Sequence, residues 1–184
     1  MSEYIILLTA TITGAIGIIQ LLIERRSVRI RDIKLNHLKD LKFKLHKFYF
    51  PIMFLLKRDE HLFESTRKLP ATENNLGVLN ELRLANHSKV MDIIESHIAD
   101  VNPVKSVRDD IISYDRHTAV YRLLSSLGIS DISTNEFNAE YPTSLLRSIE
   151  LRLEQLCREI KCTEESLAHC IPKMRISCGT PNNV

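Results

Sequence analysis

The sequence contains only five glycines in 184 residues, and two of them lie inside its one long apolar stretch. That scarcity excludes most glycine-rich phosphate-binding loops. No turn dipeptide is flanked by alternating apolar and polar residues, so β-hairpin signals are absent as well. The motifs Gly-x-Ser-x-Gly and His-Glu-x-x-His do not occur, which removes two common signatures of hydrolases. We therefore expect an all-α protein without enzymatic activity.

The sequence also lacks the Cys-x-x-Cys spacing of a zinc site, since no two of its cysteines are three positions apart. The four cysteines lie late in the chain, with His169 among them: Cys157, Cys162, Cys170 and Cys178. We expect free thiols and neither a metal nor another cofactor. A metal site that includes His169 is the alternative.

What the chain does have is an uncharged segment at its N-terminus. Residues 4–23 contain no charge, and 14 of these 20 residues are hydrophobic. As a helix they would span ~30 Å, the thickness of a bilayer's hydrocarbon core. The acidic start Met-Ser-Glu and the lack of a small-residue cleavage site argue against a signal peptide. We predict an uncleaved transmembrane helix in residues 1–24, with a signal peptide or a buried soluble helix as alternatives.

Basic residues follow this segment and predict its orientation. Between Glu24 and Lys47 there are nine Lys and Arg but three acids, whereas the remainder of the chain is mildly acidic. The positive-inside rule then places a single-pass protein in a bacterial inner membrane, N-terminus outside and C-terminal domain cytoplasmic. Because the basic excess is local, we expect no direct nucleic-acid binding. Four arginines are expected to meet anionic membrane lipids: Arg25, Arg26, Arg29 and Arg31.

One face of the apolar segment gathers its small and polar residues. At 100° per residue, a narrow arc contains Thr9, Thr13, Gly17, Gln20 and Glu24. Such residues let helices approach closely and hydrogen-bond across the contact. The arc predicts a homo-oligomer and, as a special case, the lining of a pore. The alternative is that the threonines bond to their own helix and Gln20 reaches the membrane surface.

The remainder has the apolar spacing of helices that each bury one stripe. We predict a bundle of four to five helices in residues 25–171 and a flexible tail in residues 172–184. Pro51 should interrupt the first of these helices. Asn102-Pro103 and Gly128 should end the next two, and Pro142 should open the last.

Several polar residues interrupt these apolar faces. If buried, they must be hydrogen-bonded and could form one interhelical network; the alternatives are solvent exposure and a cluster that faces a ligand or RNA. The residues are Arg83, Asn86, His87, His97, Asp115, Arg116 and His117. The arginine–histidine spacing of HEPN ribonucleases occurs once, in Arg31 and His37, which are weak catalytic candidates because chance predicts such a match.

The combination of a short chain, an apolar N-terminal segment, a basic neck and a helical domain resembles the small membrane accessory proteins of type VI-B CRISPR loci. The segments 86–94 and 116–121 also resemble single-anchor bacterial proteins. The first resemblance implies a divergent HEPN-like fold, a role in antiphage defence through a membrane pore, and functional partnership with an RNA-guided CRISPR nuclease. A membrane-tethered adaptor that recruits this nuclease, or an RNA-cleaving enzyme, are the alternative functions.

Overall fold

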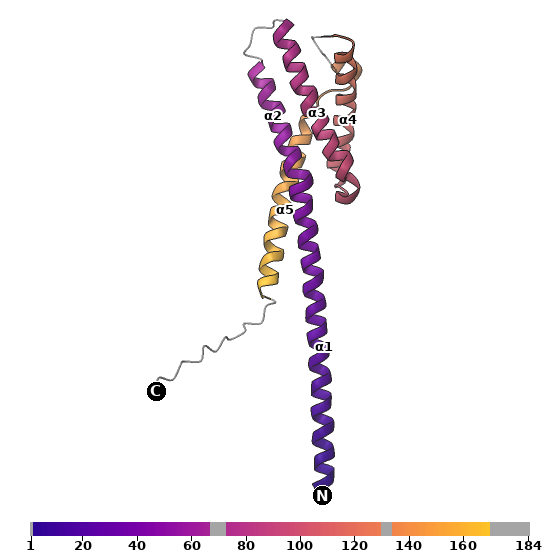
Figure 1. Ribbon diagram of the computed structural model, residues 1–184, viewed down its shortest axis with the longest axis vertical. Coiled ribbons are helices and arrows are strands. Elements are labelled where there is room, and N and C mark those ends of the chain that lie inside the picture. The colour runs from indigo at the N-terminus through magenta and orange to yellow at the C-terminus, as the bar shows by residue number, and fades with distance from the viewer. Residues whose placement is uncertain (1, 67–72, 130–133, 170–184) are drawn as a thin grey trace, which may run out of the picture. The chain divides into compact units, whose positions relative to one another are not determined.

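The computed structural model describes residues 2–66, 73–129 and 134–169, and the side chains of residues 13–64, 76–129 and 134–168. All regular elements in these residues are helical, which confirms the all-α prediction (Figure 1). In chain order they are α1 (Ser2–Phe43), the π-helix η1 (Lys44–Tyr49), α2 (Phe50–Thr66), α3 (Glu73–Val101), α4 (Lys105–Ser126), the 3₁₀-helix η2 (Asn135–Phe137) and α5 (Thr143–His169). The predicted tail at 172–184 lies outside the described residues.

The chain divides into two compact units. The terminal unit comprises Met1–Asp40 and Ile160–Val184, and the central unit comprises Leu41–Glu159. Within the terminal unit, Lys34 Nζ donates a hydrogen bond to Ser166 Oγ at 2.5 Å, which joins α1 to α5. The predicted domain boundary at residue 24 stays a prediction.

The transmembrane helix expected at the N-terminus is not supported. Among the residues whose side chains are described, no helix is both long and apolar enough to cross a membrane. From Glu24 onward α1 carries charged side chains at close intervals, Glu24, Arg25, Arg26 and Arg29, and such side chains are costly to bury in a bilayer core. This finding contradicts the predicted single-pass localisation in the inner membrane with a cytoplasmic C-terminal domain.

Pro51 changes the helix type, as its position in the sequence predicts. The π-helix η1 ends at Tyr49, and Phe50 and Pro51 continue it as the first residues of α2. Because proline lacks an N–H group and its ring crowds the preceding turn, an irregular turn is expected at this point of a continuous helix. The apolar stripe that crosses this junction is buried at Leu41, Phe48 and Ile52. The stripe therefore continues through the irregular turn and keeps α2 against its neighbours.

The predicted ends of the following helices are confirmed. Asn102 and Gly128 both have a positive φ, 44° and 75°, the left-handed conformation that commonly ends a helix. The Gly128 N–H donates to the Ser125 carbonyl at 3.0 Å. Pro142 directly precedes α5, in keeping with the restriction that proline places on the chain.

The core of the central unit lies where α2, α3 and α4 run side by side (Figure 1). Its fully buried members include Ile52, Val90, Tyr114, Ile149 and Leu156, which come from four helices. Burying one such side chain contributes about 1.5–3 kcal/mol. This packing fixes the helix backbones that carry the polar residues described next.

Candidate ligand-binding cavity

A cavity of about 480 Å³ lies within the central unit, between residues of α2, α3, α4, the segment 134–141 and the start of α5. Buried side chains form its inner wall: Asp59, His87, His117, Tyr121 and Thr134. Exposed side chains surround its opening: Glu60, Phe63, Glu64 and Thr143. Its volume lies within the range of small-molecule pockets, roughly 300–1,000 Å³.

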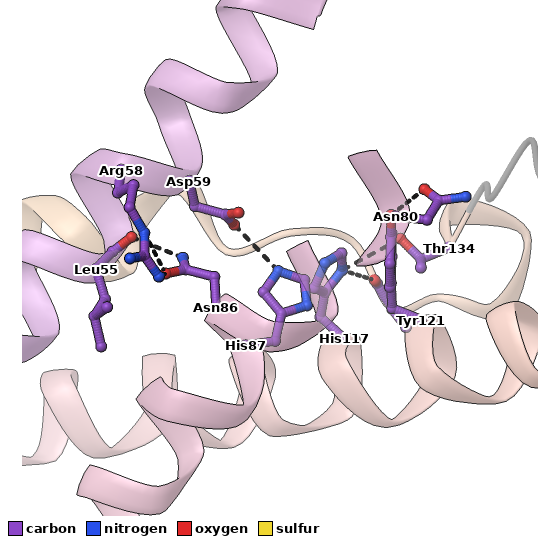
Figure 2. Close-up of polar contacts among 10 residues, drawn as sticks. Leu55, Arg58, Asp59, Asn80, Asn86, His87, His117, Tyr121 and Thr134 are labelled. Atoms are coloured by element: carbon purple, nitrogen blue, oxygen red, sulfur yellow. Dashed lines mark hydrogen bonds and ion pairs between the residues drawn. The ribbon is translucent and has the colours of Figure 1, made fainter. Parts of the chain in front are cut away.

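Asp59 and His87 form the centre of the inner wall. The His87 Nε2–H group, from α3, donates to Asp59 Oδ2, from α2, across 3.1 Å (Figure 2). The two side chains are only 8% and 3% exposed. Their remaining polar atoms, Asp59 Oδ1 and His87 Nδ1, are buried without a hydrogen-bond partner among the described residues. Such unsatisfied groups are rare in folded proteins and demand an explanation.

His117 presents an acceptor to the same cavity. Its Nδ1 lies 3.0 Å from the Ala139 carbonyl, which can only accept, so Nδ1 carries the hydrogen. Thr134 Oγ1 lies 3.3 Å from the same nitrogen. Burial lowers the pKa of His117 below its ordinary value of 6.5, because desolvation disfavours the charged ring. In the neutral ring the other nitrogen, Nε2, is an acceptor.

Aromatic rings hold His87 in place. Tyr114, His117 and Tyr121 of α4 contact its ring edge-to-face, with centroid distances of 5.7, 5.4 and 5.3 Å, a favoured arrangement of aromatic pairs. Burial raises the pKa of the Tyr114 and Tyr121 phenols, and the Arg83 guanidinium partly opposes this rise at Tyr121. Both phenols therefore remain protonated at neutral pH.

Amide side chains of α3 support the wall from either side. Tyr121 Oη donates to Asn80 Oδ1 at 2.5 Å. Asn86 is fully buried, donates through Nδ2 to the Leu55 carbonyl at 2.8 Å, and accepts from Arg58 (Figure 2). These bonds link α2, α3 and α4, so the wall is positioned before any ligand binds.

The charges around the cavity are predominantly negative. Asp59, Glu60 and Glu64 supply three carboxylates, whereas Arg83 supplies one guanidinium. That guanidinium lies over the Phe63 ring at 5.4 Å from its centroid, a cation–π contact. The opening of the cavity therefore has an acidic surface with an aromatic side chain beside it.

The structure brings some of the predicted polar residues together and separates others. Asn86, His87 and His117 lie in and behind the inner wall, and Arg83 lines the cavity. His97 instead packs its ring against Phe43, with centroids 5.6 Å apart. The last two predicted members are exposed: Asp115, which is outside the cavity lining, and Arg116, which lines a second, more open cavity of about 430 Å³.

The remaining predicted site residues lie in the terminal unit. Arg31 and His37 are exposed on α1 and belong to neither cavity. Arg25, Arg26 and Arg29 are exposed on the same helix, as are Thr13, Gln20 and Glu24, whereas Gly17 is half-buried. The side chain of Thr9 lies outside the described residues.

Sequence reasoning missed Asp59, Tyr121 and Thr134 as parts of this wall. A signal exists for Asp59, because it follows Ile52 and Leu56 at helical spacing and so places a carboxylate on the buried stripe of α2. Tyr121 was expected to pack in the core because of its aromatic ring, and nothing in the sequence indicated that its hydroxyl would lie beside a cavity. Thr134 has no local pattern, since a loop brings it to His117.

No group of three or more metal-ligating side chains occurs in the described part of the chain. Cys157 and Cys162 are free and exposed, and Cys170 and Cys178 lie outside the described residues. No protein-family model, curated protein or solved structure matches this chain.

Proposed function

We propose that the central unit binds a small organic molecule in the cavity between α2, α3 and α4. The observation that carries this proposal is that two buried atoms on residues lining the cavity, Asp59 Oδ1 and His87 Nδ1, have no hydrogen-bond partner among the described residues. Leaving such a buried group unsatisfied costs about 1–3 kcal/mol. A ligand that supplies the missing hydrogen bonds would recover this free energy as affinity.

The charge of the cavity favours small-molecule binding over RNA cleavage. A ribonuclease site needs cationic groups near the scissile phosphate, but here three carboxylates accompany one arginine. Arg31 and His37, the pair with ribonuclease spacing, are exposed in the terminal unit. RNA cleavage therefore has less support than ligand binding.

The test fills the cavity with a larger side chain. Leu146 lines the cavity on α5, whereas Leu151, five residues further along the same helix, is exposed and outside it. We expect Leu146→Trp to abolish binding of small aromatic probes, measured by calorimetry, and Leu151→Trp to retain it. Absence of saturable binding to the wild type, or equal binding by both variants, would contradict the proposal.

We propose, second, that α1 associates with α1 of another copy of the chain through the face that contains Thr13, Gly17, Gln20 and Glu24. A Cβ atom added to Gly14 or Gly17 would meet nothing within 4 Å. Glycine inside a helix costs roughly 0.5–1 kcal/mol relative to alanine, and no packing among the described residues offsets that cost. If a second helix packs against this face, the missing side chains of both glycines allow the two helix backbones to approach closely.

Light scattering of the purified full chain tests this association. Gly17→Leu should block close approach and lower the measured mass, whereas Ile18→Leu, at the neighbouring position, should leave the mass unchanged. A wild-type chain that is monomeric at all concentrations would exclude the proposal. Incorporation into lipid vesicles without self-association would exclude it too.

A part in antiphage defence beside an RNA-guided nuclease stays a prediction. A membrane pore would require a membrane-spanning helix, and no helix among the described residues meets that requirement. An adaptor that recruits the nuclease requires neither a pore nor self-association of α1. It therefore predicts that defence against phage is retained in Gly17→Leu, the variant that should block self-association.

A further inference from the structure

The inner wall of the cavity offers hydrogen-bond acceptors. Asp59 has an unsatisfied oxygen, and His117 Nε2 is an acceptor because Nδ1 donates to the Ala139 carbonyl. Oδ1 itself is almost inaccessible, but the terminal torsion of aspartate has a broad minimum. A modest rotation can therefore turn one carboxylate oxygen toward the cavity. A complementary ligand must bring N–H or O–H donors.

The charges around the cavity determine which sign of charge the ligand should carry. Asp59 lies inside, and Glu60 and Glu64 lie at the opening, so the carboxylates are distributed along the path that a ligand would follow. Arg83, the one guanidinium in the lining, is placed over Phe63. Because carboxylates outnumber cations, an anionic ligand would be repelled and a cationic one attracted.

The apolar residues of the lining also indicate the chemistry of the uncharged part of the ligand, its body. Leu56, Tyr141 and Leu146 line the cavity together with Phe63 and Tyr121. Apolar and aromatic walls favour an apolar ligand body, and aromatic faces attract cations. The phosphates of a nucleotide carry the opposite charge from the one that this site favours.

We propose that the occupant is an organic cation, a protonated amine on an aromatic or branched aliphatic body, whose ammonium group bonds to the Asp59 carboxylate. His117 Nε2 accepts a second hydrogen from the ligand. This inference rests on the proposed binding function and names its ligand class. The carboxylate oxygen of Asp59 that lacks a partner among the described residues then acquires one.

Three probes with one aromatic body separate the charge from the apolar contribution: 2-phenylethylamine, 2-phenylethanol and 3-phenylpropionate. Calorimetry on the purified full chain should rank the amine first, the neutral alcohol second and the carboxylate last. The amine should bind at least about tenfold more tightly than the alcohol, because charge-assisted hydrogen bonds exceed neutral ones.

Asp59→Asn keeps the side-chain volume and removes the charge, so it should lower amine affinity about tenfold and leave alcohol binding nearly unchanged. Asp92→Asn, at an exposed site on α3, is the matched control. If Asp59→Asn fails to fold by circular dichroism, the exposed pair Glu60→Gln with Glu64→Gln replaces it. That double variant should weaken amine binding severalfold, and more strongly at low salt.

The outcomes distinguish this inference from the function on which it rests. Equal affinity for amine and alcohol, or tightest binding of the carboxylate, overturns the cation and leaves the cavity a binding site. If both the double variant and Asp59→Asn bind the amine as tightly as the wild type does, the proposal of a cationic ligand is overturned as well. Binding of none of the probes, in wild type and Leu146→Trp alike, overturns both.

Discussion

The two units differ in where their apolar side chains lie. The central unit buries Phe48, Ile52 and Leu156 against neighbouring helices, whereas the described part of α1 in the terminal unit exposes Ile18 and Leu21 by 61% and 59%. Polar residues show the opposite distribution. Asn86 and His87 are buried in the central unit, while the described charged side chains at the N-terminal end of the terminal unit, from Glu24 to Asp32, are exposed.

This contrast shows that the two units differ in how they bury apolar surface and hydrogen-bond polar groups. The central unit pairs its apolar surfaces internally and hydrogen-bonds most of its buried polar groups. The exposed run of α1 lacks comparable cover among the described residues, and a helix with apolar residues on most sides needs a neighbour. The units should therefore respond differently to the same kind of substitution.

The largest difference is expected for leucine-to-alanine substitutions. Leu156→Ala should lower the free energy of unfolding by about 2–5 kcal/mol, because a fully buried side chain leaves a cavity. Leu21→Ala should change it by less than about 0.5 kcal/mol, as exposed substitutions generally do. Denaturant unfolding followed by circular dichroism measures both, and equal losses would remove the contrast between the units.

A smaller effect is expected for polar groups. Asn86→Ala removes the bonds to the Leu55 carbonyl and to Arg58 and should cost about 1–3 kcal/mol. Ser113→Ala is the comparison, since its hydroxyl donates to the Asp109 carbonyl at 3.1 Å but is exposed. The same unfolding measurement should show almost no loss for Ser113→Ala. A similar loss for both variants would mean that the burial of a hydrogen bond does not determine its contribution to the free energy of unfolding.

The smallest effect concerns pH. Because the pKa of His117 is below 6.5 in the folded chain, the unfolded chain takes up this proton first, and stability falls as the pH drops below 6.5. His117→Asn should reduce this dependence, and His61→Asn, at an exposed site on α2, should not. Thermal unfolding between about pH 7 and pH 5 measures the slopes, and an unchanged slope in His117→Asn would contradict the assignment.

Much of the fold of the central unit followed from local sequence patterns. Pro51, Gly128 and Pro142 act on their own backbone, so their effects on helix boundaries do not depend on distant residues. The apolar stripe from Leu41 to Leu55 is equally local, because helical periodicity alone places its members on one face. The N-terminal segment was the exception: hydropathy and length predicted a membrane span, which the described part of α1 does not support.

The cavity could be predicted only in part. Asn86, His87 and His117 were recognised because polar residues interrupted apolar helix faces, but the same criterion selected His97 and Asp115, which lie elsewhere. Periodicity gives the face of a helix and not the residue opposite it. The choice of Asp59 as the partner of His87 depends on how α2 packs on α3.

Local sequence patterns were sufficient to predict that the chain is helical, several of the helix boundaries in the central unit, and the faces that these helices bury, because backbone restrictions and apolar spacing act over a few residues. Which polar residues meet depends instead on how the helices pack. Asp59 and His87, or His117 and Ala139, are separated by 28 and 22 positions. Such pairs depend on the packing of whole helices and on a loop, and no local pattern encodes that arrangement.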